Sequence, residues 1–133
     1  RDDGTSKQYV PIEFPALADS GMVQALIAAA ESRGVSYRVG IGHSKDAFYS
    51  EYPNHVAHSE KTRRRWETLR KAKVLATEME AAALFVIGYL RGVRVGTVCV
   101  VIGEPVGEEV TISGKPPVEK LTQIALDALT TLK

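Results

Sequence analysis

The sequence predicts an α/β fold in which helices pack on a sheet, and two neighbouring segments carry this prediction. Residues 77–90 repeat apolar side chains at helical spacing. Residues 93–102 follow as an almost continuous valine-rich run, which is typical of a strand buried on both faces. A helix that leads directly into a buried strand indicates layered βα structure. Because 133 residues make about one domain, we expect a single α/β unit over residues 1–133.

The first part of the chain predicts a loop, or at most an edge strand, followed by a helix. Residues 1–15 are polar or broken by prolines, which lack the N–H group that a strand ladder needs. Residues 16–33 carry apolar side chains at helical spacing. We expect Asp19 or Ser20 to be the N-cap of this helix and Gly34 to end it.

The remaining elements follow from periodicity and from turn-forming residues. Residues 35–41 alternate apolar and polar side chains and predict a short strand, whereas residues 42–60 lack a period and favour a loop. Residues 59–73 are strongly basic and carry Glu–Arg and Glu–Lys pairs four residues apart, which favours a solvated helix. Residues 103–117 indicate a loop, and residues 118–132 have the spacing of a last helix.

Composition excludes several classes of protein. The chain is 44% hydrophobic and 25% charged, and 17 Lys and Arg against 16 Asp and Glu leave a formal charge of +1. This excludes global disorder and gives no general attraction to nucleic acid or to an anionic membrane. No apolar run approaches the ~18 residues that span a bilayer. The arginines at 63–65 indicate a solvated helix face rather than a nucleic-acid patch.

The single cysteine excludes an internal disulfide framework. Cys99 falls inside the predicted buried strand, where a thiol behaves as a small apolar group, so we do not expect it to act as a nucleophile. His43, His55 and His58 lack the spacing of metal ligands, and we expect no metal site. We expect a cytoplasmic protein.

Two segments are candidates for chemistry. Glu78-Met79-Glu80 stands at the start of the alanine-rich helix, where carboxylates stabilise the helix N-terminus. Alternatively, one of these carboxylates faces a pocket and accepts hydrogen bonds from a polyol such as ribose. Phe48 lies in the segment 44–49, at the end of the first predicted strand, where ligands bind in α/β sheets. Phe48 either stacks on a planar base or, with Tyr49, fills the core.

Several sequence blocks, in their order and spacing, resemble the carboxy-terminal half of the uridine phosphorylases, and the resemblance covers nearly the whole chain. The blocks are Arg1-Asp2-Asp3-Gly4-Thr5-Ser6, Tyr9, Pro11-Ile12-Glu13-Phe14-Pro15-Ala16, Ser44-x-Asp46-x-Phe48-Tyr49 and Glu78-Met79-Glu80-Ala81-Ala82. The resemblance implies the nucleoside phosphorylase fold, an α/β/α sandwich around a mixed sheet, of which this chain would be the C-terminal part. It also implies the reaction, in which phosphate attacks the anomeric carbon of a nucleoside and releases base and ribose 1-phosphate.

The resemblance assigns roles to five residues. It implies that Phe48 packs on the base and ribose, that Met79 and Glu80 contact the ribose hydroxyls, and that Glu78 lines the same pocket. Ile102 stands where the family closes the base pocket. No cofactor is implied, because phosphate is the second substrate.

The chain departs from the family pattern at two places. Pyrimidine-specific members carry a Gln-x-Arg readout of uracil, whereas this chain has Ser-Glu-Tyr-Pro-Asn-His over residues 50–55. Asn54 or His55 would have to replace it. Purine-specific relatives place a catalytic Asp after the buried strand, where this chain has Gly103 and Glu104. The sequence leaves the base open, with uridine as the first expectation.

The resemblance places the phosphate-binding loop and arginines upstream of Arg1, and two or three strands are few for three helices. We therefore expect a fragment, or a separate chain that supplies the first half, and no turnover by this chain alone. The family assembles as dimers that pair into hexamers, so we expect a homo-oligomer. Two other functions remain open, namely hydrolysis by a nucleosidase of the same fold and nucleoside binding without turnover.

Overall fold

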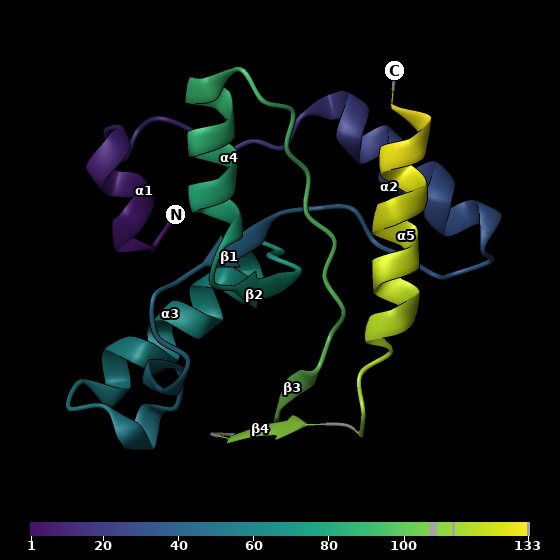
Figure 1. Ribbon diagram of the computed structural model, residues 1–133. Helices are drawn as coiled ribbons and strands as arrows, with labels where there is room; N and C mark the ends of the chain where they lie inside the picture. Colours follow the sequence, from purple (N-terminus) through teal and green to yellow (C-terminus); the bar gives the residue numbers. More distant parts are fainter. Residues whose placement is uncertain (107–108, 113, 133) are drawn as a thin grey trace.

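The computed structural model describes residues 1–106, 109–112 and 114–132 (Figure 1). The helices are α1 (Gly4–Tyr9), α2 (Ser20–Ser32), α3 (Ser59–Lys71), α4 (Ala81–Arg91) and α5 (Val118–Thr131), with short 3-10 turns η1 (Tyr49–Glu51) and η2 (Pro53–His55). The strands are β1 (Gly42–Ser44), β2 (Ala76–Glu78), β3 (Gly103–Val106) and β4 (Glu109–Ile112). In the described part of the chain, no helix is long and apolar enough to cross a membrane.

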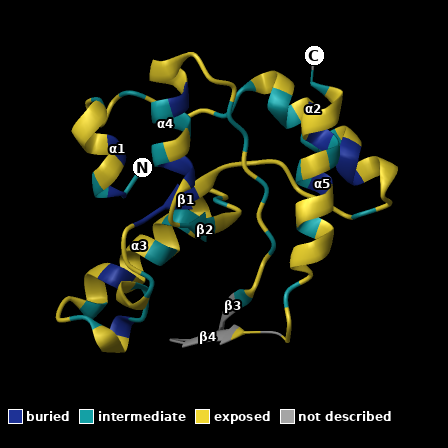
Figure 2. Ribbon diagram, in the orientation of Figure 1, coloured by how far each residue is buried: buried dark blue, intermediate teal, exposed yellow. Residues whose placement is uncertain are grey.

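Helices α2 and α5 pack side by side and form a small core of their own (Figure 1). Their contact consists mainly of alanines, which let the two backbones approach closely, together with one larger residue, Ile124. The buried residues of this core are Ala25, Ala29, Ala30, Ile124 and Ala128. Figure 2 shows buried positions on both α2 and α5. At the surface the Arg33 guanidinium donates to the Asp127 carboxylate at 2.6 Å, which joins the end of α2 to α5.

A second unit is built from two short parallel strands and the helix that follows them. Strand β1 pairs with β2, so that Gly42 lies opposite Ala76 and Ser44 lies opposite Glu78. Helix α4 follows β2 after two residues and contacts α1 and β1 (Figure 1). Val86 of α4 is fully buried. This arrangement brings the ends of β1 and β2 to the N-terminus of α4.

Neither strand that the apolar pattern predicts forms where it was expected. Residues 35–41 form no strand, and β1 begins only at Gly42. Residues 93–102 run as an extended connection from α4 to β3 without pairing to any described strand, and Val101 is 66% exposed (Figure 1). A strand requires a neighbour for its N–H and C=O groups, which an apolar run cannot provide by itself. Cys99 is accordingly exposed rather than buried.

The predicted helices are confirmed, with shifts at their ends, and the loops hold structure that the pattern missed. Asp19 caps α2 by accepting the Met22 N–H at 2.9 Å, and Gly34 follows with φ +61°. The first residues of the predicted 77–90 helix instead form β2 and a turn. Helix α1 and the β3–β4 hairpin lie in segments predicted as loops. Within the described residues the strands form two separate two-stranded sheets, so the predicted α/β/α sandwich is not complete here.

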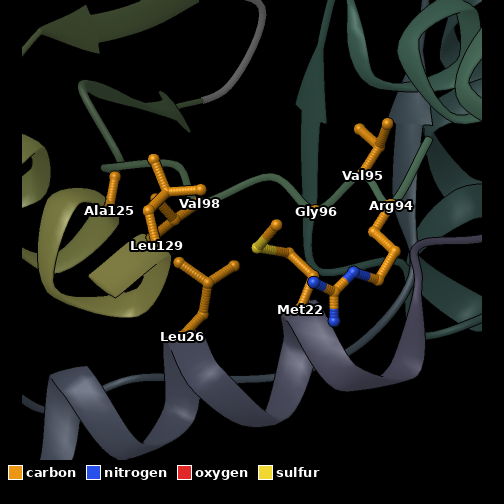
Figure 3. Close-up of a pocket in the computed structure, with 8 residues that line it drawn as sticks. All are labelled: Met22, Leu26, Arg94, Val95, Gly96, Val98, Ala125 and Leu129. Atoms are coloured by element: carbon orange, nitrogen blue, oxygen red, sulfur yellow. The ribbon is translucent and has the colours of Figure 1, made fainter. Parts of the chain in front are cut away.

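A cavity lies between α2, α5 and the extended connection (Figure 3). It measures about 190 Å³ and is lined mainly by apolar side chains, among them Met22, Leu26 and Leu129. Gly96 allows the connection to pass close to α2, because a Cβ there would lie 2.3 Å from the Met22 Cγ. None of the five site residues named from the sequence lines this cavity.

Candidate functional site

Glu78 and Ser44 together cap the N-terminus of α4. The Glu78 carboxylate accepts the backbone N–H of Glu80 at 2.7 Å and that of Ala81 at 2.5 Å. The Ser44 hydroxyl donates to the same carboxylate and accepts the Ala82 N–H at 3.0 Å. The helix-start interpretation is therefore confirmed for Glu78, whose oxygens satisfy N–H groups that the helix itself leaves unpaired.

Glu80 differs from Glu78, although only one residue separates them. The residue is exposed, and its carboxylate makes no hydrogen bond or ion pair within the described part of the chain. Met79, between them, is 37% exposed. Glu80 therefore keeps the full acceptor capacity of its two oxygens, next to the positive end of α4.

A buried ion pair ties the loop after β1 to β2. The Lys45 ammonium is paired with the Glu51 carboxylate, and the two side chains are 9% and 8% exposed. Thr77 of β2 donates its hydroxyl to the same carboxylate at 3.1 Å, and the Trp66 indole N–H donates to the Glu51 carbonyl at 3.1 Å. The Lys45 N–H in turn donates to the Glu78 carbonyl at 3.1 Å.

Sequence reasoning missed the roles of Ser44, Lys45 and Glu51. Lys45 and Glu51 lie in a segment without periodicity and are six positions apart in the chain, so no local pattern joins them. A signal does exist for Ser44, since it ends the first strand at the edge where ligands and helix N-termini meet in α/β structure. To recognise the capping role of Ser44 from this signal, one also needs the register of β1 against β2, which is known only from the structure.

Phe48 is half-buried and lies at the centre of an aromatic group. Its ring is 5.5 Å from that of Tyr49 and 5.8 Å from that of Tyr52, both edge-to-face. The Lys45 ammonium lies 5.5 Å from the Phe48 centroid. Because Tyr49 is 72% exposed, the interpretation that both rings fill the core is wrong for Tyr49. The Phe48 ring thus contacts two tyrosine rings and the ammonium of the Lys45–Glu51 pair.

The extended connection of residues 93–102 lies near the Glu78 and Glu80 carboxylates at Cys99, but not at its last residue, Ile102. Cys99 is exposed, but the atoms around its thiol still exclude part of the solvent, and this partial desolvation and then the charges of Glu78 and Glu80 raise the pKa of the thiol. Ile102 is 48% exposed and directly precedes β3, a strand that is drawn apart from β1 and β2 (Figure 1). The structure therefore does not bring Ile102 together with the other site residues. The side chain of Glu104 lies outside the described residues.

Comparison with known proteins gives consistent matches. A family model described as the phosphorylase superfamily matches residues 1–130. The chain is 45% identical over 105 residues to the uridine phosphorylase of Treponema pallidum, which covers 77% of this chain and 40% of that protein. It is 33% identical over 141 residues to the guanosine phosphorylase of Halorubrum lacusprofundi, covering 99% of this chain and 54% of that protein.

Among solved structures, an AMP nucleosidase from Bacteroides thetaiotaomicron matches with a TM-score of 0.69 and 21% identity, over 98% of this chain and 47% of that chain. At this identity the likeness shows the fold alone. The chain thus spans about half the length of these relatives. Since the family model matches nearly every residue of the chain, this protein belongs to the phosphorylase superfamily.

Proposed function

We propose that the chain forms the nucleoside-binding half of a nucleoside phosphorylase, which converts a nucleoside and phosphate into free base and ribose 1-phosphate. The observation that carries this proposal is the division of roles between Glu78 and Glu80. Glu78 is held by two backbone N–H groups, whereas Glu80 is exposed beside it and its carboxylate has no hydrogen-bond or ion-pair partner among the described residues. A free carboxylate of this kind accepts two adjacent hydroxyls, as a ribose cis-diol presents them.

The ribose and base would occupy the side of β2 and η1 that carries Met79 and Phe48. Met79 provides an exposed apolar contact next to Glu80. Phe48 provides a half-buried ring whose centroid lies 5.5 Å from the Lys45 ammonium, and an aromatic face suits a planar base. The transition state of glycosyl transfer has oxocarbenium character, so a carboxylate that holds the ribose hydroxyls also stabilises the positive charge that develops on the sugar.

Phosphate would have to be bound by groups other than the N-terminus of α4. A helix N-terminus binds phosphate through free N–H groups, but those of Glu80, Ala81 and Ala82 already donate to Glu78 and Ser44. This supports the expectation that the phosphate site comes from an upstream half or from a partner chain. We also propose that the protein is a homo-oligomer and that this chain alone gives little turnover.

We propose uridine as the nucleoside, from the likeness to uridine phosphorylases. The likeness to a guanosine phosphorylase makes a purine nucleoside the competing substrate. Residues 50–55 lack the Gln-x-Arg motif by which pyrimidine-specific members of the family recognise uracil. This segment therefore favours neither base.

The experiment is to incubate the chain with uridine or guanosine, with and without phosphate, and to measure free base and ribose 1-phosphate. The same four reactions are repeated after adding a chain that carries the upstream half of a uridine phosphorylase. We expect base release only with phosphate and only in the second set. Equal release without phosphate would identify a nucleosidase instead, and nucleoside binding without release would identify a non-catalytic binding module.

A further inference from the structure

The extended connection of residues 93–102 has the side-chain pattern of a strand. Burial alternates along its second half, where half-buried Val98 and Val100 stand between exposed Thr97, Cys99 and Val101. Such alternation is typical of a strand that packs one face and leaves the other open. Gly96 and Val98 line the cavity toward α2 and α5, so these two helices cover the packed face (Figure 3).

The backbone of this segment is nevertheless unpaired. Among the residues that the structure describes, the N–H and C=O groups of residues 96–101 find no hydrogen-bond partner, and we call this stretch the 96–101 edge. Directly before it, the Val95 carbonyl accepts the Asp19 N–H at 2.8 Å, so the connection is anchored where the edge begins. A row of unpaired backbone groups in an extended segment is a template for a further strand.

The composition of the 96–101 edge favours pairing with an apolar strand. The edge holds no charged residue and no proline, which are the features that protect exposed edges from other chains. Positions 97, 98, 100 and 101 are threonine or valine, whose branched side chains suit a pleated sheet. A charged strand would lie against these side chains without a counter-ion, so the edge fits an uncharged partner strand.

The edge also lies beside the proposed nucleoside residues. Cys99 is close enough to Glu78 and Glu80 for their charges to act on its thiol. Neighbouring strands of a sheet are about 5 Å apart, so a strand that pairs with the edge comes close to the same carboxylates. Strand addition at the edge therefore brings the groups of a second chain next to Glu80, where phosphate has to meet the ribose.

The occupant of the edge follows from what the chain lacks. The described residues form two separate two-stranded sheets, and sheets of that size are marginal on their own. The chain spans about half the length of its relatives, so each of them holds a comparable length of chain outside the match. We propose that the 96–101 edge binds an extended apolar strand from the upstream half of a nucleoside phosphorylase, through the backbone hydrogen bonds of strand addition. The identity of this partner rests on the proposed function.

Amide hydrogen exchange tests this proposal. The 133-residue chain is co-expressed with a tagged chain that carries the upstream half of a uridine phosphorylase, and the complex is isolated through the tag. We expect the amides of residues 96–101 to exchange at least about a hundredfold more slowly in the complex than in the chain alone. The absence of a complex, or a complex without protection of the edge, would overturn the proposal. Protection in the chain alone that rises with its concentration would overturn it in favour of a second copy of this chain.

Proline variants locate the contact. Val100→Pro and Val101→Pro each remove one N–H group, and because successive N–H groups of a strand point to opposite sides, the two variants test both sides of the edge. At least one of them should reduce the recovery of the complex by about tenfold, as expected for a lost backbone hydrogen bond. Ser59→Pro, at the first position of α3, where proline is tolerated, is the matched control and should leave the recovery unchanged. Undiminished recovery with both edge variants, or an equal loss in all three proteins, would contradict the proposal.

These measurements do not depend on turnover, so they separate this proposal from the proposed function. A complex that protects the edge but releases no base from a nucleoside would contradict the proposed function alone. Phosphate-dependent release of base by a complex in which residues 96–101 stay unprotected would contradict the proposal of strand addition alone.

Discussion

Ser44 and Glu78 lie directly opposite each other on the parallel strands β1 and β2, and the Ser44 hydroxyl donates to the Glu78 carboxylate. The pair closes the N-terminus of α4, because each of the two side chains also accepts backbone N–H groups from the start of that helix. A strand pair thereby fixes where α4 begins. The beginning of α4 in turn fixes the backbone position of Glu80, the residue that we propose binds the ribose hydroxyls.

Replacing Glu78 should affect stability more than replacing Glu80. Glu78→Ala removes the acceptor for two N–H groups, so we expect the free energy of unfolding to fall by about 1–2 kcal/mol, the usual cost of losing an N-terminal cap. Glu80→Ala is the matched control and should change it by less than about 0.5 kcal/mol, as for other exposed positions. Urea unfolding of both variants measures this, and equal losses would argue against the capping role.

Removing only one partner of the Lys45–Glu51 pair should lower the stability of the protein strongly. Lys45→Met leaves the Glu51 carboxylate buried without a cation, and we expect a loss of about 3–5 kcal/mol. The double variant Lys45→Met with Glu51→Leu removes both charges and should recover much of that loss. Thermal unfolding of the single and double variants tests this. If the double variant were less stable than the single one, the pair would not be the source of the cost.

Cys99 should report on the two carboxylates of the site. Because partial desolvation and the charges of Glu78 and Glu80 raise the pKa of its thiol, we expect slow alkylation by iodoacetamide at pH 8 although the residue is exposed. Glu80→Gln removes one of these charges and should accelerate the reaction. Glu60→Gln on α3 serves as the control and should leave the rate unchanged. The same rate in all three proteins would show that Cys99 does not lie near Glu80.

Asp3 should contribute stability that depends on pH. Burial raises the pKa of its carboxyl, but the hydrogen bonds from the N–H and hydroxyl of Ser6 outweigh burial and lower it. A lowered pKa in the folded state stabilises the protein above the pKa of the unfolded state, at about pH 4, and the contribution is lost as the pH falls through the folded-state pKa. The difference in unfolding free energy between the natural chain and Asp3→Asn should therefore be larger at pH 7 than at pH 2.5. A difference independent of pH would contradict this.

The sequence predicted helices better than strands, for a physical reason. A helix satisfies its own backbone, so the spacing in residues 16–33 and 118–132 was enough to predict α2 and α5. A strand depends on a neighbour that the local sequence does not name, so the valine-rich run 93–102 indicated burial without identifying a partner. The surface pairs Glu60–Arg64 and Glu67–Lys71 were predicted correctly because both partners lie on one helix.

The candidate site was predicted in part. The sequence singled out Phe48 and the segment from Glu78 to Glu80, but it could not separate the capping carboxylate from the free one. That separation follows from the register of β1 against β2, which places Ser44 beside Glu78. The Lys45–Glu51 pair was missed because both residues lie in a segment without helix or strand periodicity, so no sequence pattern pairs them.

The most direct measurement compares Glu80→Gln with the natural chain in a nucleoside turnover assay in which the upstream half is supplied. Glutamine keeps the size of the side chain but accepts ribose hydroxyls through one neutral oxygen, so we expect kcat/KM for the nucleoside to fall at least about tenfold. Glu60→Gln, on the surface of α3, should leave it unchanged. If Glu80→Gln turned over the nucleoside as well as the natural chain, Glu80 would not bind ribose and the proposed nucleoside site would be wrong.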